Sequence, residues 1–361
     1  MRELTEIDLR DIIIGCTLLG TGGGGDPEEG WELIESELKK GKRFLLASLS
    51  EVPDDKIVAT PYFVGSLGGA KVEPVYPEGI ACRAYRLLEE YMGEKFFGVI
   101  STELGGANTA VALAIAAELE RPVIDADPVG RSVPGLEHSS FYVKGISMTP
   151  FSVVSPFGDE TIFERVKNDF QAEKLVRAMV SSLGTNVGVC SHPVRGRDLK
   201  ESVINDAISY SLRLGRALRE ARESGENPAL RLVQKEGAFL LFEGVCVESR
   251  FEEKEGFTVG RFALEGKGEF EGKRYEVFFK NENMYSLMDG EIDITIPDLI
   301  CVVSIDGDPI TNPNVKEGEE YYVLGFPAHP IWRSERGLEL LGPKYLNLDV
   351  EYVPIEKKRG R

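Results

Sequence analysis

Three carboxylate residues follow two neighbouring apolar runs closely enough to do chemistry together. Glu103 comes just after the first run, and Asp125 and Asp127 close the next one. Such a group can hold a hard cation such as Mg²⁺ or supply a general base that activates water. It can equally cap helices and accept hydrogen bonds from loop amides, which is the structural alternative. Arg131, a few positions later, can neutralise one carboxylate or orient a substrate carbonyl.

Four consecutive glycines at positions 22–25 are the second candidate site. They stand directly before a helix start, with Asp26 as the N-cap and Pro27 at the first helical position. Consecutive glycines are used where the backbone needs positive φ or must approach something closely. Amide groups that point at a ligand from a helix N-terminus are one such use, and a tight turn between two helices is the alternative.

The glycine spacing formally satisfies the dinucleotide fingerprint, but its context does not. That fingerprint follows a strand, whereas the residues before Gly20 have a helical period, and no acidic residue ends the next strand. The stretch also lacks the lysine of a phosphate-binding P-loop, and Asp26 would repel a phosphate. We therefore expect no dinucleotide cofactor and a neutral or weakly charged ligand, with a divalent cation as the only cofactor to test.

Two polar groups in the second half of the chain complete the set. His329 lies between prolines and beside Trp332, where it can serve as an acid–base group, as a substrate contact or in packing. The amides and carboxylate of Asn281, Glu282 and Asn283 suit a ring with both donors and acceptors, although a polar strand end explains them as well. The chain has only three histidines and no Cys/His pairing, so a zinc site is not expected.

Alternating strands and helices must position the first two groups. Apolar runs at 44–49, 57–63, 96–100 and 122–125 predict strands, and helices are predicted at 80–92 and 109–119. This alternation predicts an α/β domain with a largely parallel sheet. Ligands bind outside the carboxyl ends of such strands, so the loops 66–70, 103–108 and 125–131 are expected to line one pocket with the glycines.

The second half of the chain has a different pattern of predicted secondary structure. Two long helical patterns, at 169–183 and 200–223, flank a strand at 187–190, and short β-type runs follow from residue 230. We therefore expect an α/β domain at 1–165, a helix pair with an antiparallel β-rich (α+β) domain at 166–355, and a solvated basic tail at 356–361.

Composition limits which partners and which cell compartment are expected. A net charge of −18 disfavours nucleic acid and anionic membranes, and no apolar run spans a bilayer. The five scattered cysteines and the lack of a signal-peptide pattern indicate reduced thiols in a cytoplasmic protein. The two glutamines among many Glu, Lys and Arg residues hint at a thermophile.

Several stretches taken in order resemble the S-methyl-thiohydantoin desulfurase family, formerly a domain of unknown function, over nearly the whole chain. One departure occurs at Asp206-Ala207, where relatives tend to carry Gly-Thr before Ile-Ser. The stretches that carry the resemblance are 19–27, 68–70, 103–108, 125–127, 130–131, 281–283, 297–300 and 325–328. The resemblance implies an α/β N-terminal domain, a β-rich C-terminal domain, hydantoin-type metabolism and hydrolytic removal of a methylthio group.

The leading hypothesis is therefore a hydrolase that acts on a small cyclic amide or thioimidate of hydantoin type. Glu103 or Asp127 would activate water, and His329 would protonate the leaving group. The alternative is a protein that binds such a ring without catalysis, or a companion subunit of a hydantoinase/oxoprolinase. A homo-oligomer is the other protein assembly to test. The expected substrate-binding residues are Gly22, Gly23, Gly24, Gly25, Gly68, Gly69, Asn108, Arg131, Asn281, Glu282 and Asn283.

Overall fold

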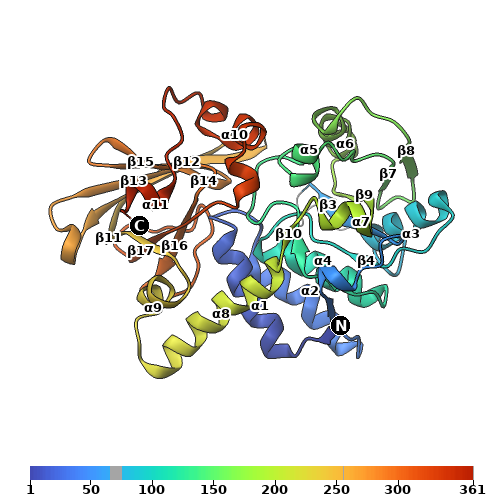
Figure 1. The fold of residues 1–361 in the computed structure, drawn as a ribbon, viewed down its shortest axis with the longest axis horizontal. Helices are drawn as coiled ribbons and strands as arrows, with labels where there is room; N and C mark the ends of the chain where they lie inside the picture. Colours follow the sequence, from blue (N-terminus) through green and yellow to red (C-terminus); the bar gives the residue numbers. More distant parts are fainter. Residues whose placement is uncertain (66–74, 255, 361) are drawn as a thin grey trace.

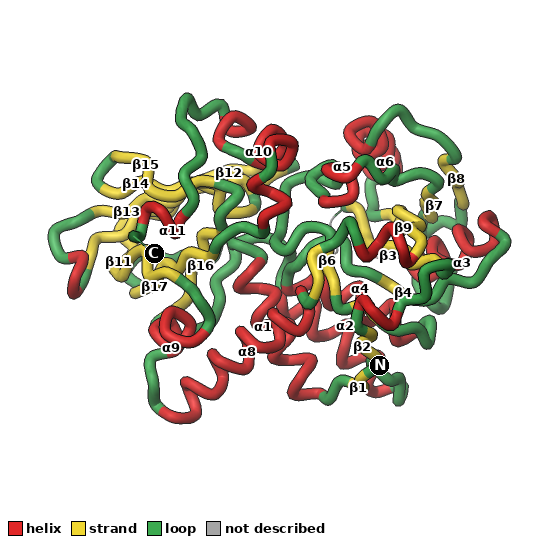
Figure 2. The backbone as a smooth tube through the Cα atoms, viewed as in Figure 1, coloured by secondary structure: helices red, strands yellow, loops and turns green. Residues whose placement is uncertain are grey.

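The computed structural model describes residues 1–65, 75–254 and 256–360. Two large sheets lie at opposite ends of the long axis of the molecule, and long helices lie between them (Figure 1). The tube view separates the same two groups of strands (Figure 2).

The first sheet is mixed rather than largely parallel. Four central strands, β2, β5, β4 and β3, are parallel, and antiparallel strands extend the sheet on both sides. In sheet order the strands are β1 (Arg2–Glu3), β2 (Leu45–Ala47), β5 (Val123–Ile124), β4 (Gly98–Val99), β3 (Ile57–Val64), β9 (Val187–Arg195), β7 (Phe151–Val154) and β8 (Glu160–Phe163). The predicted α/β class is confirmed. The antiparallel half was not predicted because β9 arrives from beyond the expected domain boundary.

The helices around this sheet begin and end largely where their sequence signals indicate. Asp26 caps α2 by accepting from the amides of Glu28 and Glu29, with Pro27 at the first helical position, as predicted. The helices are α1 (Glu6–Leu19), α2 (Pro27–Lys39), α3 (Ile80–Met92), α4 (Gly106–Glu118), α5 (Ser140–Lys144), α6 (Asp169–Leu183), α7 (Gly196–Lys200), α8 (Ala207–Ser224) and the 3-10 turn η1 (Leu49–Glu51). Helix α9 (Pro228–Lys235) follows α8 and contacts β11 of the second sheet.

The helix predicted at 200–223 is interrupted. Strand β10 (Ile204–Asn205) pairs with β6 (Ala126–Asp127) in a small separate sheet, and α8 starts only after it. Asp206 precedes α8 with φ +58°, a left-handed conformation that suits glycine better than aspartate. Asp206 is also where the sequence departs from the pattern of the family that it resembles, so the departure falls on a real backbone constraint.

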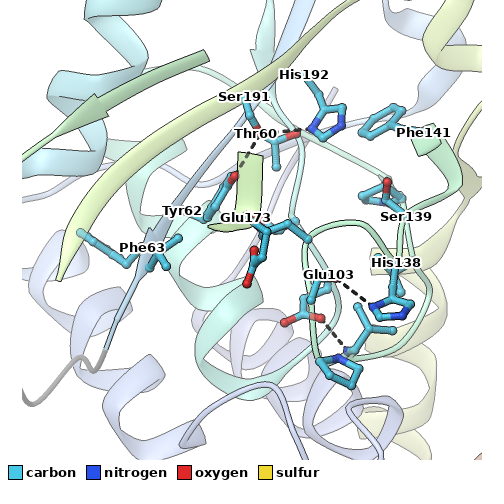
Figure 3. Close-up of a pocket in the computed structure, with 18 of the residues that line it drawn as sticks. Thr60, Tyr62, Phe63, Glu103, His138, Ser139, Phe141, Glu173, Ser191 and His192 are labelled. Carbon is cyan, nitrogen blue, oxygen red and sulfur yellow. Dashed lines mark hydrogen bonds between the residues drawn. The ribbon is translucent and has the colours of Figure 1, made fainter. Parts of the chain in front are cut away.

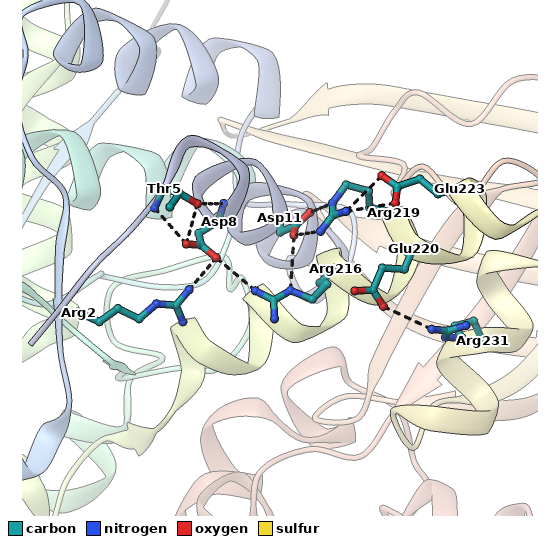
Figure 4. A network of polar contacts seen from close by, with 9 residues as sticks. All are labelled: Arg2, Thr5, Asp8, Asp11, Arg216, Arg219, Glu220, Glu223 and Arg231. Carbon is teal, nitrogen blue, oxygen red and sulfur yellow. Dashed lines mark hydrogen bonds and ion pairs between the residues drawn. The ribbon is translucent and has the colours of Figure 1, made fainter.

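Helices α1 and α8 pack at very close range. A Cβ atom added to Gly15 would lie 1.9 Å from the Ser211 carbonyl oxygen, and one added to Gly215 equally close to that of Asp11. The two glycines thus let the backbones approach each other. Alongside them, the buried Asp11 accepts two hydrogen bonds of 2.9 Å from Arg219, within the polar network of Figure 4.

The second sheet has seven strands, all antiparallel, as predicted. In sheet order they are β15 (Glu291–Thr295), β14 (Glu282–Met288), β13 (Arg274–Lys280), β12 (Phe257–Gly266), β11 (Phe239–Lys254), β17 (Glu320–Phe326) and β16 (Leu299–Ser304). The remaining elements are η2 (Gly268–Phe270), η3 (Pro330–Arg333), α10 (Glu335–Leu341), η4 (Pro343–Leu346) and α11 (Ile355–Lys358).

The boundary expected between residues 165 and 166 is not the boundary between the two sheets, because β9 belongs to the first. One large hydrophobic core also crosses the junction, since it joins residues of α1 and α8 to β16 and β17. The expected basic tail is partly held in place: Arg359 pairs with Asp293 and Arg333 with Glu356. All five cysteines are buried and unpaired with one another. None of the helices in the described ranges has the length and apolar character needed to cross a membrane.

Candidate functional site

Glu103 lies in the turn between β4 and α4, at the carboxyl end of a parallel strand. Its Oε1 accepts from the Asn108 side-chain amide at 2.6 Å, and its Oε2 accepts from the Val133 amide at 2.7 Å. Burial, together with the negative charge of Glu282, raises the pKa of the Glu103 carboxyl well above its usual range. The first turn of α4 and the loop at Val133 therefore hold this carboxyl in a fixed orientation, and its affinity for a proton is unusually high.

Glu282 approaches the same place from the second sheet. It opens β14 directly after Asn281, whose φ of +58° makes the tight turn from β13. The side chain is buried, and Ser132 donates to its Oε1 at 3.1 Å. Its Oε2 has no hydrogen-bond partner among the residues that the structure describes. Burial raises the pKa of Glu282 to about 7, and the nearby Arg131 charge opposes that rise.

The glycine loop packs tightly against both carboxyl-bearing segments. A Cβ added to Gly23 would lie 2.2 Å from Oε1 of Glu282, and one added to Gly24 would lie 2.4 Å from the Gly105 Cα. The Gly24 carbonyl accepts from the first amides of α4, those of Ala107 and Asn108. The glycines thus have a structural reason, close approach to two neighbouring segments, alongside their predicted role in ligand binding.

These groups surround one polar cavity of about 370 Å³, which we call the glycine-loop cavity. It brings together residues predicted from three separate stretches of the chain, namely Gly22, Gly23, Gly24, Gly25, Glu103, Asn108, Asn281 and Glu282. Glu103 also lines two neighbouring cavities, of about 500 and 360 Å³, so the three share a wall. Of the loops expected here, 125–131 lines the 500 Å³ cavity but not the glycine-loop cavity, and Gly68 and Gly69 lie outside the described residues.

Asp125 and Asp127 use their carboxyl oxygens for hydrogen bonds within the protein. Asp125 accepts from the backbone amide and the hydroxyl of Ser209 in the first turn of α8. Oδ1 of the fully buried Asp127 accepts from the amides of Val129 and Gly130, and burial raises its pKa to about 7. Within the described ranges, no three His, Cys, Asp or Glu side chains are placed to hold a metal ion. The three carboxylates expected to share a cation are therefore not gathered.

Arg131 and Asn283 join the two halves of the molecule rather than face the glycine-loop cavity. The buried Arg131 guanidinium donates to the Thr21 hydroxyl at 3.0 Å and to the Pro297 carbonyl at 3.0 Å. Asn283 donates from its side chain to the Ile300 carbonyl and from its backbone to that of Thr21. Both were predicted to bind substrate. In the structure their donors are instead directed at backbone carbonyl oxygens and at the Thr21 hydroxyl.

His329 lines a different cavity, of about 520 Å³, together with Tyr210, Arg213, Trp332 and one side of Arg131. Its Nδ1 accepts from the Ile331 amide at 3.3 Å, which caps η3, and partial burial lowers the pKa of the ring. The structure thus does not bring His329 to the cavities that Glu103 lines.

Sequence reasoning missed a polar group on β9. The larger cavity beside Glu103 is lined by Tyr62, Phe141, Glu173, Ser191 and His192 (Figure 3). Ser191 Oγ lies 3.1 Å from His192 Nδ1 and donates to the Tyr62 hydroxyl at 3.3 Å. The run 187–190 reads as an ordinary buried strand. The only available signal was the pair of polar residues that continues it.

Fold and site together define a class: a two-domain protein with a polar cavity at the domain junction, lined by one glutamate from each domain. Models of the S-Me-THD-like N-terminal and C-terminal domains match residues 7–165 and 167–355, respectively. The chain belongs to this family, the S-methyl-thiohydantoin desulfurase family.

One solved structure has the same fold as this chain. A crystal structure of a protein from Chromobacterium violaceum aligns with a TM-score of 0.78 at 22% sequence identity, covering 98% of this chain and 100% of that one. At this identity the likeness establishes the fold alone. A comparison with curated proteins gives no match.

Proposed function

We propose that this protein is a hydrolase that removes a thiol from a ring of the S-methyl-thiohydantoin type. The observation that supports this proposal is the pair of buried carboxyl groups, Glu103 and Glu282, at one polar cavity. Two interacting carboxyl groups with raised pKa values are suited to hold one proton and to accept another. Family membership supports the substrate class.

The reaction needs one base and one acid. Glu282, in its ionised form, takes a proton from water while the water oxygen attacks the ring carbon that bears sulfur. Protonated Glu103 gives its proton to the adjacent ring nitrogen as the C=N bond becomes single. When the tetrahedral carbon collapses, its hydroxyl proton returns to Glu103 and a C=O bond forms. The C–S bond breaks, and methanethiolate takes the proton held by Glu282. Both carboxyl groups are restored.

The neighbouring side chains of the cavity fit a ring with polar edges. Asn108 holds Glu103, and Asn281 and the loop at 22–25 line the same wall. We assign no step to His329 or Asp127, because neither is among the residues that line the glycine-loop cavity.

The test is release of a thiol from a 2-methylthio-imidazolinone, followed with a thiol-reactive chromophore. We expect Glu103→Gln and Glu282→Gln each to lower turnover by at least about 100-fold, since a positioned proton-transfer group contributes roughly 10²–10⁴-fold. Glu223→Gln, on the exposed side of α8, is the control and should keep full activity. Full activity of both cavity variants would reject the proposal. Ring binding without thiol release by the unaltered protein would instead indicate a binding protein or companion subunit.

A further inference from the structure

The cavity of about 500 Å³ beside Glu103, which we call the histidine cavity, has no role in the reaction just described. It shares Glu103, Val133, Arg177 and Asn281 with the glycine-loop cavity. A ring held next to Glu103 therefore has space beside it for a substituent. Figure 3 shows the Glu173 carboxylate directed into this space, between Tyr62 and Glu103.

The walls of the histidine cavity combine aromatic surface with a fixed imidazole. The His192 ring stacks on Phe141 with centroids 4.7 Å apart and planes inclined by 22°. His192 lies within a β-bulge in the pairing of β3 with β9, between Ser191 and Val194, and its φ is +46°, so the local backbone is held away from a regular strand. Because Ser191 engages Nδ1, Nε2 is the nitrogen that faces other groups, and Asp169 Oδ2 lies 3.5 Å from it.

Several buried polar atoms of this wall make no hydrogen bond within the described part of the chain. They are Thr60 Oγ1, Glu173 Oε2 and His192 Nε2, on side chains that are 1%, 9% and 6% exposed, respectively. Buried polar atoms are nearly always paired in folded proteins. Thr60 Oγ1 and Glu173 Oε2 can accept a hydrogen bond, and His192 Nε2 can do so when the ring proton is on Nδ1, which describes a site for a group that donates several.

The charged groups around the histidine cavity also favour a hydrogen-bond donor as its ligand. Glu103 and Glu173 line it, and Asp169 lies behind it with its Oδ2 3.5 Å from His192 Nε2. Arg177 is the basic side chain of the lining, and it is already paired with Glu173 while its guanidinium lies over the Phe257 ring. A carboxylate placed here would face the Glu173 carboxyl group, whereas a cation would favour the ionised form of Glu173.

We infer that the histidine cavity binds the substituent of the hydantoin-type ring, and that this substituent ends in a hydrogen-bond donor, with ammonium preferred to carboxamide and carboxylate least. Glu173 and His192 would accept from the donor, and Phe141 and Tyr62 would cover its apolar stem. Burial raises the pKa of Glu173, and an ammonium group beside it would favour the ionised form. The inference rests on the proposed function, because the ring must be held beside Glu103.

Calorimetric titration with four hydantoins tests it, each carrying an aminopropyl, carbamoylethyl, carboxyethyl or butyl group at the same ring carbon. We expect the aminopropyl compound to bind at least about 10-fold more tightly than the carboxyethyl compound, as a charge reversal at a buried site commonly gives. Tighter binding of the carboxyethyl compound, or equal binding of all four, would overturn the inference while leaving the proposed function intact. Failure of every ring to bind would reject both.

Two variants test whether Glu173 and His192 bind the substituent. Glu173→Gln removes the charge and His192→Phe keeps the stacking on Phe141, so each should reduce the aminopropyl preference to about 3-fold or less while binding of the butyl compound persists. Glu201→Gln, on the exposed surface after α7, should change neither. If both cavity variants keep the full preference, the substituent is bound elsewhere. The series on the unaltered protein decides the preference even if a variant fails to fold.

Discussion

Asp127 illustrates how a catalytic residue type can be used for a structural purpose. One of its oxygens accepts from two loop amides, and the other, Oδ2, has no partner in the described ranges. The pKa of about 7 means that the folded protein retains this proton where an unfolded chain would have lost it. The side chain is thus mostly protonated below about pH 7.

This difference between folded and unfolded states gives a pH dependence with a definite sign. Because the folded pKa of Asp127 lies above its usual value of 3.8, its contribution to stability is complete below about pH 4 and is lost as the pH rises to about 7. Glu282 acts in the same direction. We expect the melting temperature of the unaltered protein to fall from pH 5 to pH 8.

The variant Asp127→Asn isolates one residue of this effect. The amide keeps an oxygen for the Val129 and Gly130 amides and has no proton to lose, so the melting temperature should fall less steeply with pH. At pH 8 the variant should be the more stable protein. Differential scanning calorimetry across pH 5–8 measures both slopes, and parallel slopes would show that Asp127 ionises normally.

Among the elements, the pairing of α1 with α8 is the least tolerant contact described. A methyl group at Gly215 would overlap the Asp11 carbonyl, and neither backbone can move without disturbing the Asp11–Arg219 pair. We expect Gly215→Ala to lower the free energy of unfolding by about 2 kcal/mol or more, since overpacking commonly costs 1–3 kcal/mol.

The matched change on the other face of the same helix is Glu220→Ala, at an exposed position. It should stay within about 0.5 kcal/mol of the unaltered protein, as most surface substitutions do. Urea unfolding compares the two variants. Equal stability of Gly215→Ala and the unaltered protein would mean that the helices can separate at little cost.

The same elements show what a sequence can and cannot predict. The start of α2 was predictable because Asp26 and Pro27 are local signals, and α3 and α6 follow their helical periods to the residue. The break before α8 could not be predicted, because the pairing of residues 204–205 with β6 depends on a segment far away in the chain. Glu103 and Glu282 were each predicted separately, but their proximity required the β13–β14 turn and the packing of one domain on the other.

At the scale of the whole molecule, the glycine loop is where the two domains meet. Gly23 does not have a left-handed φ, and the atom its Cβ would strike is the end of a side chain, Oε1 of Glu282. We expect Gly23→Ala to displace that carboxyl group and to lower thiol release by at least about 10-fold. Circular dichroism and the melting temperature should change little.

Gly24→Ala is the contrasting variant, because φ is +84° and the clash is with the Gly105 backbone. It should lower the melting temperature by several degrees, since both strain and overlap act on the fold itself. If Gly23→Ala is instead the less stable of the two, or if it retains full activity, the position of Glu282 does not depend on this contact.

The contact between the glycine loop and Glu282 also limits how this gene can recombine. A chimera that joins residues 1–165 of one relative to the second domain of another inherits a loop shaped for a different partner. Even where each half folds, Gly22 must still leave room for Asn312 and Gly23 for Glu282. Glycines of the first half and polar residues of the second are therefore expected to change together between lineages, as one inherited unit that spans the two domains.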